Sequence, residues 1–426
     1  MRVLKKVLLW LLLVAVLAAA LAGGAVWLLY RAQDAAPPAE PAAAFGGQAL
    51  APVRVEWTAP VLGGLLKKAY ARDGAAQDLG VFDSAVLDFT MPPDYSGSLA
   101  VYREGETAPV WTSGGDARLV FDRNGSYLLK ASCIKPQDPA DPAKGYGSFD
   151  YEARFTLDVA PAVSFSAVKA EQGDVVAVLV TGIMDGSQPE IDAGELSLST
   201  FMDTPEGKAA YIGLAYNREP GEYTVRVQCG TLAVERTVTV VHRDFPRQNM
   251  TIDEDVAADT HDSAAANKEW RDAIWPTYWT AEPTRYWQGR FQWPTQSHAL
   301  NTEYGLFRYT NGSATPERHG GIDIDAGEGD PVTAPAAGKI VYAGFLQLTG
   351  NTVVLDHGGG LKSYFFHMSA LDCAPGDVLE AGAPVGKVGS TGYSTGAHLH
   401  YEVKIGNQSI DPIQLFDGTS GLYFAE

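Results

Sequence analysis

The sequence AHLHYEVKI at residues 397–405 predicts the strand on which the C-terminal part of the chain is built. Apolar and polar residues alternate along it, which is the pattern of a strand with two different faces. Residues i and i+2 of a strand project from one face about 7 Å apart. We therefore expect His398 and His400 to face one polar site, with Leu399, Tyr401 and Val403 on the opposite face.

The sequence RHGGIDID at residues 318–325 supplies further candidate ligands. His319 and Asp323 are four residues apart, but Gly320 and Gly321 between them disfavour a helix and favour a loop that enters a strand. Asp323 and Asp325 would share one face of that strand, so spacing does not choose between the two carboxylates. Two histidines and one carboxylate are a usual ligand set for catalytic zinc, which keeps a fourth position for water.

Four stretches together resemble a known family. RHGGIDID, GDPVTAPAAGKI, GNTVVLDHGGGLKSYFFHMSAL and PGDVLEAGAPVGKVGSTGYSTGAHLHYEV occur in this order between about residues 297 and 417. In order and spacing they resemble the lysostaphin/LytM-type zinc metallopeptidases, which cut peptidoglycan cross-bridges and have the duplicated hybrid motif fold. The resemblance implies a compact, mostly antiparallel β domain with a cleft open to extended peptide.

The resemblance also implies a role for each residue of the constellation. It implies that His319, Asp323 and His400 bind one Zn²⁺, and that His367 and His398 are catalytic histidines that do not bind the metal. Asp325 would then belong to a loop or to the surroundings of the ligands.

Such a site suits peptide hydrolysis. A zinc ion with three protein ligands lowers the pKa of its bound water toward about 7 and polarises the scissile carbonyl. The sequence has no H-E-x-x-H motif, and therefore lacks the glutamate base of helical zinc proteases. Histidine has a suitable pKa for proton transfer near neutrality, so His367 and His398 are the candidates for that work.

His357 is a less certain member of the site. The sequence Asp-His-Gly-Gly-Gly is typical of a strand that enters a hairpin turn, where a polar residue needs no special role. The alternative is that His357 orients a metal ligand. The glycine-rich segment 389–396 lacks the G-K-[ST] ending of a phosphate loop, so we interpret it as a loop beside the cleft.

The N-terminus predicts a membrane anchor. Residues 7–30 contain no charged side chain and can span about 30 Å of hydrocarbon as a helix. Three basic residues precede the segment and one follows it, so residues 1–6 should stay cytoplasmic and the bulk of the chain should lie outside the cell membrane. We favour an uncleaved anchor over a secretory signal, whose apolar core is only about 7–15 residues.

The region between anchor and catalytic domain predicts four segments. Residues 31–53 are rich in Ala and Pro and predict a stalk of up to about 70 Å. Short alternating strands predict two β-sandwich, Ig-like modules at 54–160 and 161–245, which act as spacers or bind envelope proteins. Residues 246–290 form a connector with one short helix that Pro276 stops. The peptidase domain occupies 291–420.

Five tryptophans crowd the approach to that domain: Trp270, Trp275, Trp279, Trp287 and Trp293. We interpret them as packing residues, because large aromatic side chains dominate burial energetics. The alternative is a rim that stacks on the sugars of the cell wall.

Charge and cysteine content exclude other classes. The net charge of −19 argues against a nucleic-acid-binding protein, which needs basic faces. The three cysteines, Cys133, Cys229 and Cys373, are too few and too scattered for a disulfide framework or a thiolate zinc site.

The sequence thus predicts a mainly β, membrane-anchored zinc endopeptidase that acts on peptidoglycan cross-links or stem peptides. The alternative is a catalytically silent scaffold or hydrolase activator in a cell-envelope or sporulation complex, since a site does not prove its use.

Overall fold

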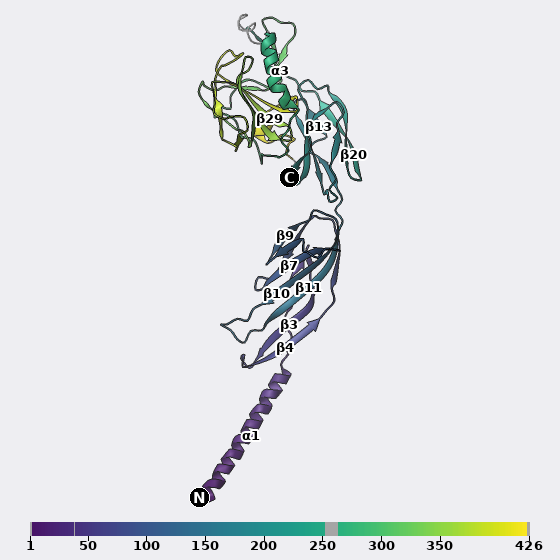
Figure 1. Cartoon of the computed structure of the whole chain (residues 1–426), viewed down its shortest axis with the longest axis vertical. Helices are drawn as coiled ribbons and strands as arrows, with labels where there is room; N and C mark the ends of the chain where they lie inside the picture. The colour runs from purple at the N-terminus through teal and green to yellow at the C-terminus, as the bar shows by residue number, and fades with distance from the viewer. Residues whose placement is uncertain (1, 38, 252–262, 424–426) are drawn as a thin grey trace. The chain divides into compact units, whose positions relative to one another are not determined.

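The computed structural model describes residues 2–37, 39–251 and 263–423, and its contacts divide the chain into two compact units, Met1–Ala160 and Pro161–Glu426 (Figure 1). Met1 of the predicted cytoplasmic segment, Pro38 of the predicted stalk and residues 252–262 of the predicted connector lie outside the described residues. The mainly β architecture with an apolar N-terminal helix is confirmed. The boundaries of the individual domains stay predictions, apart from the start of the first sandwich, which the contacts of Phe45 correct below.

The first unit begins with the helix α1 (Arg2–Ala32). Residues 3–32 are long and apolar enough to cross a membrane, with a mean hydropathy of 2.6 in the most apolar window and no part of that window buried against the rest of the chain. An apolar helix with no apolar face covered by protein is typical of a membrane segment.

Two facing sheets follow in this unit. One has the order β2-β1-β6-β9, and the other has the order β4-β3-β11-β10-β7-β8, with β5 paired in parallel to β11. Their bounds are β1 Ala44–Phe45, β2 Gln48–Ala49, β3 Pro52–Val61, β4 Leu66–Asp73, β5 Gln77–Phe82, β6 Val86–Thr90, β7 Ser96–Arg103, β8 Trp111–Ser113, β9 Ala117–Val120, β10 Gly125–Lys135 and β11 Tyr146–Leu157. Alternate residues of β10 and β11 are buried, which is how an antiparallel sheet covers a core with one face.

The predicted stalk is shorter than the sequence suggested. Phe45 is fully buried and its ring lies 5.0 Å from that of Phe155, so β1 belongs to the sandwich core. Leu50 is also buried. The prediction missed them because β1 and β2 are only two residues long each, too short to show an alternating pattern beside an Ala- and Pro-rich segment. Residues 44–53 are therefore part of the first sandwich and not of a stalk.

The second unit begins with another sandwich. One sheet has the order β12-β14-β18-β16, with β17 paired to β18, and the other has the order β13-β20-β19-β15. Their bounds are β12 Ala162–Phe165, β13 Lys169–Glu171, β14 Val175–Thr181, β15 Glu190–Asp192, β16 Ser197–Leu198, β17 Met202–Thr204, β18 Gly207–Gly213, β19 Gly221–Cys229 and β20 Leu232–Val241. Val176, Val178 and Val225 contribute to the core between these sheets.

The other face of β14 and β18 packs on the C-terminal domain. Val175, Ala177 and Tyr211 are buried in one hydrophobic core with Ile405 and Ile410 of that domain. β14 is therefore buried on both faces, which suits its continuous apolar sequence.

The C-terminal domain is built on a large antiparallel sheet of order β22-β25-β33-β29-β28-β27-β31, with β34 paired to β33. Two small sheets, β21-β23-β24 and β26-β32-β30, and the short helix α4 complete it. The bounds are β21 Arg247–Met250, β22 Leu300–Thr302, β23 Phe307–Thr310, β24 Glu317–Arg318, β25 Ile322–Ile324, β26 Pro331–Thr333, β27 Gly338–Leu346, β28 Gly350–Gly358, β29 Leu361–Met368, β30 Ala370–Leu371, β31 Val378–Leu379, β32 Pro384–Lys387, β33 Leu399–Ile405, β34 Gln408–Ile410 and α4 Ile413–Asp417.

The connector helix α3 (Ala264–Tyr278) lies beside the large sheet that contains β29 (Figure 1). Ser263 caps its first turn by accepting a hydrogen bond from the backbone of Ala266. The helix continues two residues past Pro276, where the sequence predicted its end. Near the C-terminus the proline removes only one backbone bond, and the packing of Ile274 and Tyr278 against the sheet outweighs that loss.

Candidate metal centre

The pairing of β25 with β33 brings the first two candidate ligands together. Asp323 lies directly opposite His400 in the antiparallel register. Gly321 makes this approach possible, because a Cβ atom there would lie only 2.2 Å from the carbonyl oxygen of Tyr401. The glycine pair is therefore a loop that enters a strand, as the sequence predicts.

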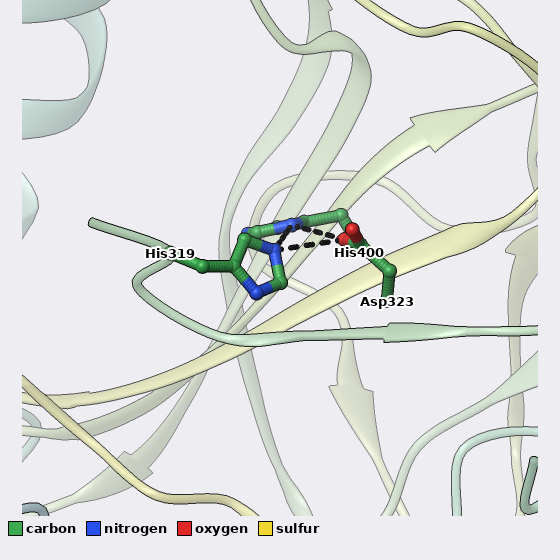
Figure 2. Close-up of side chains that lie close together, drawn as sticks. All are labelled: His319, Asp323 and His400. Carbon is green, nitrogen blue, oxygen red and sulfur yellow. Dashed lines mark hydrogen bonds and ion pairs between the residues drawn. The ribbon is translucent and has the colours of Figure 1, made fainter. Parts of the chain in front are cut away.

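His319, Asp323 and His400 point toward one another (Figure 2). His319 Nε2 lies 2.9 Å from Asp323 Oδ1 and 2.9 Å from His400 Nδ1, and His400 Nδ1 lies 2.8 Å from Asp323 Oδ1. All three residues are buried. Each offers one ligand atom to a common point.

The hydrogen bonds outside this triangle determine which ring nitrogens carry protons. His319 Nδ1 donates to the carbonyl oxygen of Glu303 at 3.0 Å, so its Nε2 is left with a lone pair. His400 Nε2 faces a carboxylate oxygen of Glu402 at 3.4 Å, so its proton lies on that side and Nδ1 is free to bind.

Three atoms with lone pairs would then face one another at less than 3 Å. Such an arrangement is stable only with a positive charge between the atoms, either a proton or a metal ion. Burial lowers the pKa of His400, but its bonds to Asp323 and Glu402 outweigh burial and raise that pKa to about 9. A proton and a metal ion therefore compete for the same place, and the two-histidine, one-carboxylate set fits zinc.

Arg308 holds the outer oxygen of the carboxylate. Its guanidinium donates to Asp323 Oδ2 at 3.2 Å and to the hydroxyl of Thr302 at 3.3 Å. Oδ1 therefore stays directed at the two histidines. Although burial raises the pKa of Asp323, the contacts with His319 and His400 hold it well below its usual range.

Glu402 and Lys404 form a second layer behind His400. Lys404 Nζ lies 2.7 Å from the other carboxylate oxygen of Glu402, and it also donates to the hydroxyl of Ser409 at 2.7 Å. On the other side, the ring of Phe366 stacks on His400 with 5.2 Å between centroids. Phe366 therefore restrains the face of the imidazole ring, and Glu402 restrains its Nε2 edge.

The two predicted catalytic histidines lie beside this centre. His398 Nε2 is 3.7 Å from Asp323 Oδ1, and the ring of His367 lies 5.1 Å from that of His398. His367 Nδ1 donates to the carbonyl oxygen of Thr391 and His398 Nδ1 to that of Gly396, each at 2.8 Å. Both Nε2 atoms consequently keep a lone pair.

The backbone and surroundings of His367 are unusual. Its φ angle is +61°, a region that few non-glycine residues occupy and that concentrates at functional sites. Burial, with His400 and His398 nearby, lowers the pKa of His367 to about 3. Its imidazole is therefore neutral near pH 7.

Two other candidates lie elsewhere. Asp325 is exposed, beyond the end of β25, and is not among the clustered ligands. His357 is fully buried: its Nδ1 donates to the carbonyl oxygen of Ala337 at 2.9 Å, and its Nε2 accepts from the hydroxyl of Ser363 at 2.8 Å. Neither partner is a candidate ligand. This favours the structural interpretation of His357.

The centre opens into a cavity of about 760 Å³. The connector contributes Gln248, Thr251 and Trp270 to its wall, and the glycine-rich segment contributes Tyr393 to Gly396. Trp287 and Trp293 pack against aromatic neighbours, whereas Trp275 and Trp279 are exposed. Thus one of the five tryptophans lines the cleft, and it comes from the connector helix.

The sequence did not identify Arg308 or Glu402 as functional. Glu402 could have been found, since it is two residues from His400 on the same face of a strand. Arg308 gave no local signal, because its contact with Asp323 depends on how β23 lies beside β25.

Comparison with known proteins gives a similarity to peptidases. The model of peptidase family M23 matches residues 317–412. DD-carboxypeptidase/endopeptidase Mpg of Neisseria meningitidis serogroup B is 43% identical over 97 residues, which are 23% of this chain and 22% of the relative. Lysostaphin of Staphylococcus staphylolyticus is 37% identical over 86 residues, which are 20% of this chain and 18% of the relative.

A solved structure of the catalytic domain of lysostaphin from Staphylococcus simulans is 28% identical, with a TM-score of 0.22, and the match covers 33% of this chain and 94% of that chain. The chain spans only about a fifth of the length of the curated relatives.

Proposed function

We propose that the chain is a membrane-anchored, extracytoplasmic zinc endopeptidase, because the model of peptidase family M23 matches residues 317–412. Its substrate would be the peptide cross-links or stem peptides of peptidoglycan. The observation that carries the proposal is the convergence of three lone-pair atoms, from His319, Asp323 and His400, beside two further histidines in one cleft.

His319, Asp323 and His400 would hold the zinc ion, and Arg308, Glu303 and Glu402 would orient these ligands through the bonds described above. When bound, zinc would supply a Lewis acid and an activated water for attack on the scissile carbonyl.

His367 and His398 would carry the proton transfers. Since each Nδ1 donates to a backbone carbonyl, each Nε2 can accept a proton from the attacking water. The same nitrogen, once protonated, can donate to the oxygen that gains negative charge or to the departing amine. The two backbone carbonyls keep both rings in the tautomer that this work requires.

The test is zinc content and peptide release from purified peptidoglycan with the full chain in detergent. Asp323→Ala is expected to lose both zinc and release, because it removes a ligand. His398→Ala is expected to keep zinc and to lose about 10²–10⁴-fold in rate, the usual contribution of a general acid or base.

Asp325→Ala is the matched control, because Asp325 is an exposed carboxylate two residues from the proposed ligand. It should keep zinc and rate. A wild-type chain that holds zinc but releases nothing from several wall types would favour a silent scaffold or a hydrolase activator.

The anchor and the β modules complete the proposal. α1 would remain uncleaved and hold the catalytic domain outside the cell membrane. Binding of envelope proteins by the β modules is also a proposal, and nucleic acid is not an expected partner. Alkaline extraction of membranes that contain the full chain tests the anchor.

A further inference from the structure

The edge of the first sandwich that contains Lys68 lies against the C-terminal end of α1. Lys68, near the start of β4, donates to the carbonyl oxygens of Tyr30 and Gln33 at 3.3 and 2.5 Å. Its ammonium also lies 5.6 Å from the centre of the Tyr30 ring. These contacts join the end of the apolar helix to one edge strand of the sandwich.

A second contact fixes the direction in which that strand runs. Glu40 pairs with Arg72, four residues further along β4, and the hydroxyl of Tyr151 donates to the carbonyl of Pro41. From Arg72 to Lys68 the strand therefore runs toward the end of α1. Leu65 lies three residues beyond Lys68 in the same direction, about 10 Å further.

Chain length limits how far Arg72 can lie from the end of α1. Seven residues separate Gln33 from Glu40, so they span at most about 25 Å. The distance from Arg72 back to Leu65 along the strand is about 23 Å. Because the contact of Lys68 with the end of α1 sets the direction of the strand, these similar lengths place the tip of the β3–β4 hairpin, residues 62–68, within reach of the membrane surface.

The chemistry of this hairpin tip suits a lipid surface. The side chain of Leu65 is 84% exposed and that of Leu66 38% exposed, and two lysines follow them. A single exposed leucine needs no explanation. Two exposed leucines next to two lysines, beside the end of an apolar helix, are typical of a segment that enters the headgroup region to a depth of about 5–10 Å.

The neighbouring loop, residues 136–145, opposes this contact with a net charge of only −1. The tip lies against the loop between β10 and β11, since a Cβ atom on Gly64 would meet the carbonyl of Pro142 at 2.8 Å. In that loop Lys144 pairs with both Asp138 and Asp141. Lys67, which donates to the hydroxyl of Tyr146, remains exposed.

We propose that the tip of the β3–β4 hairpin is a second membrane contact, in which Leu65 and Leu66 enter the leaflet from which α1 emerges and Lys67 faces its anionic headgroups. This inference rests on the membrane anchoring proposed above. It makes the first sandwich a module held against the membrane at one end.

The test uses the full chain in vesicles of phosphatidylcholine and phosphatidylglycerol. An environment-sensitive fluorophore is attached to Leu65→Cys in a Cys373→Ser background, because Cys133 and Cys229 are buried. Thr107→Cys is the matched control, since it is exposed in the β7–β8 turn. Arg103, at the start of that turn, pairs with Tyr127 of β10. Tyr127 is eight residues from Lys135, the end of β10 that lies near the hairpin tip, so the turn lies about 27 Å from that end.

The label at residue 65 is expected to show a blue-shifted emission that headgroup spin-labelled lipids quench, whereas the label at residue 107 shows neither. Adding Leu66→Asp should return the emission at residue 65 toward that of residue 107. Equal, unquenched emission from both positions in vesicle-bound chain overturns the hairpin contact alone. A blue shift that lipids do not quench indicates a protein contact and also overturns it.

Alkaline extraction of the same vesicles separates this result from the proposed function. A chain that is released by extraction has no membrane anchor, and that outcome overturns both the anchor and the hairpin contact.

Discussion

At the scale of single residues, Glu402 connects the candidate metal centre to a buried cation. Its carboxylate accepts from His400 on one oxygen and pairs with Lys404 on the other. Although burial raises the pKa of Glu402, Lys404 and His400 lower it well below its usual range. We expect Glu402→Ala to lower zinc affinity about 10–100-fold, the usual effect of removing such an orienting group. Competition with a chromophoric chelator measures it.

Glu402→Ala also leaves the buried ammonium of Lys404 without its carboxylate, which destabilises the fold. The double variant Glu402→Ala, Lys404→Met should recover stability but not zinc affinity. Glu380→Gln, at an exposed site in the same domain, is the control for affinity. Recovery of affinity in the double variant would contradict an orienting role for Glu402.

His357 predicts how stability depends on pH. Burial, together with the nearby Lys362, lowers its pKa to about 4 in the folded chain, against about 6.5 when unfolded. Between these values the unfolded state binds a proton that the folded state does not. The contribution of His357 to the free energy of unfolding is therefore fully present above pH 6.5. As the pH falls toward 4, this free energy decreases by up to about 3 kcal/mol.

Denaturant-dependent hydrogen exchange of β28 and β29 at several pH values measures this effect. His357→Asn should flatten the dependence between pH 6.5 and 4, whereas His298→Asn, at an exposed imidazole, should leave it unchanged. An unaltered slope in His357→Asn would assign the acid sensitivity of this sheet to other groups.

At the scale of elements, α3 is a structural part of the C-terminal domain. Ile274 is fully buried against Val354 and Tyr364, and the hydroxyls of Thr277 and Tyr364 lie 3.2 Å apart. We expect Ile274→Ala to destabilise the docked helix by about 2–4 kcal/mol, because it leaves a cavity. Amide exchange of α3 measures this, with the 73% exposed Trp279→Ala as control.

Because Trp270 of α3 lines the cleft, Ile274→Ala should also weaken substrate binding without loss of zinc. Unchanged exchange in α3 would mean that Ile274 does not hold the helix in place.

Individual strands show which parts of the structure could be predicted from the sequence and which could not. Alternation along 397–405 gave the strand β33 and the face shared by His400 and Glu402, because a period of two is local information. The sequence also predicted a strand at β14, but not that its run of valines, which does not alternate, is buried on both faces. It could not give Arg308 as a partner of Asp323, since that contact joins strands of two different sheets and follows no local pattern.

At the scale of the whole second unit, the second sandwich and the C-terminal domain are joined through a common interior. Gly213 of β18 approaches β33 so closely that a Cβ atom would lie 3.2 Å from Cβ of Ile405. Arg243 pairs with Asp411 at 2.8 Å, and Gln414 donates to the carbonyl of Gly173 at 2.7 Å. The sequence favoured a spacer or a partner-binding module, and a spacer needs no such shared core.

A chain that begins at residue 246 should therefore be far less stable than one that begins at residue 161. Without Val175, Ala177 and Tyr211, the side chains of Ile405 and Ile410 lose their cover, and each leucine-sized group returned to water costs about 1.5–3 kcal/mol. We expect residues 161–426 to melt in one transition and to bind zinc. Residues 246–426 should melt about 6–24 °C lower, or aggregate, since each 1 kcal/mol shifts Tm by about 2–4 °C in a domain of this size. Calorimetry of the two fragments with and without zinc measures this, and equal melting temperatures would return the second sandwich to the role of a spacer.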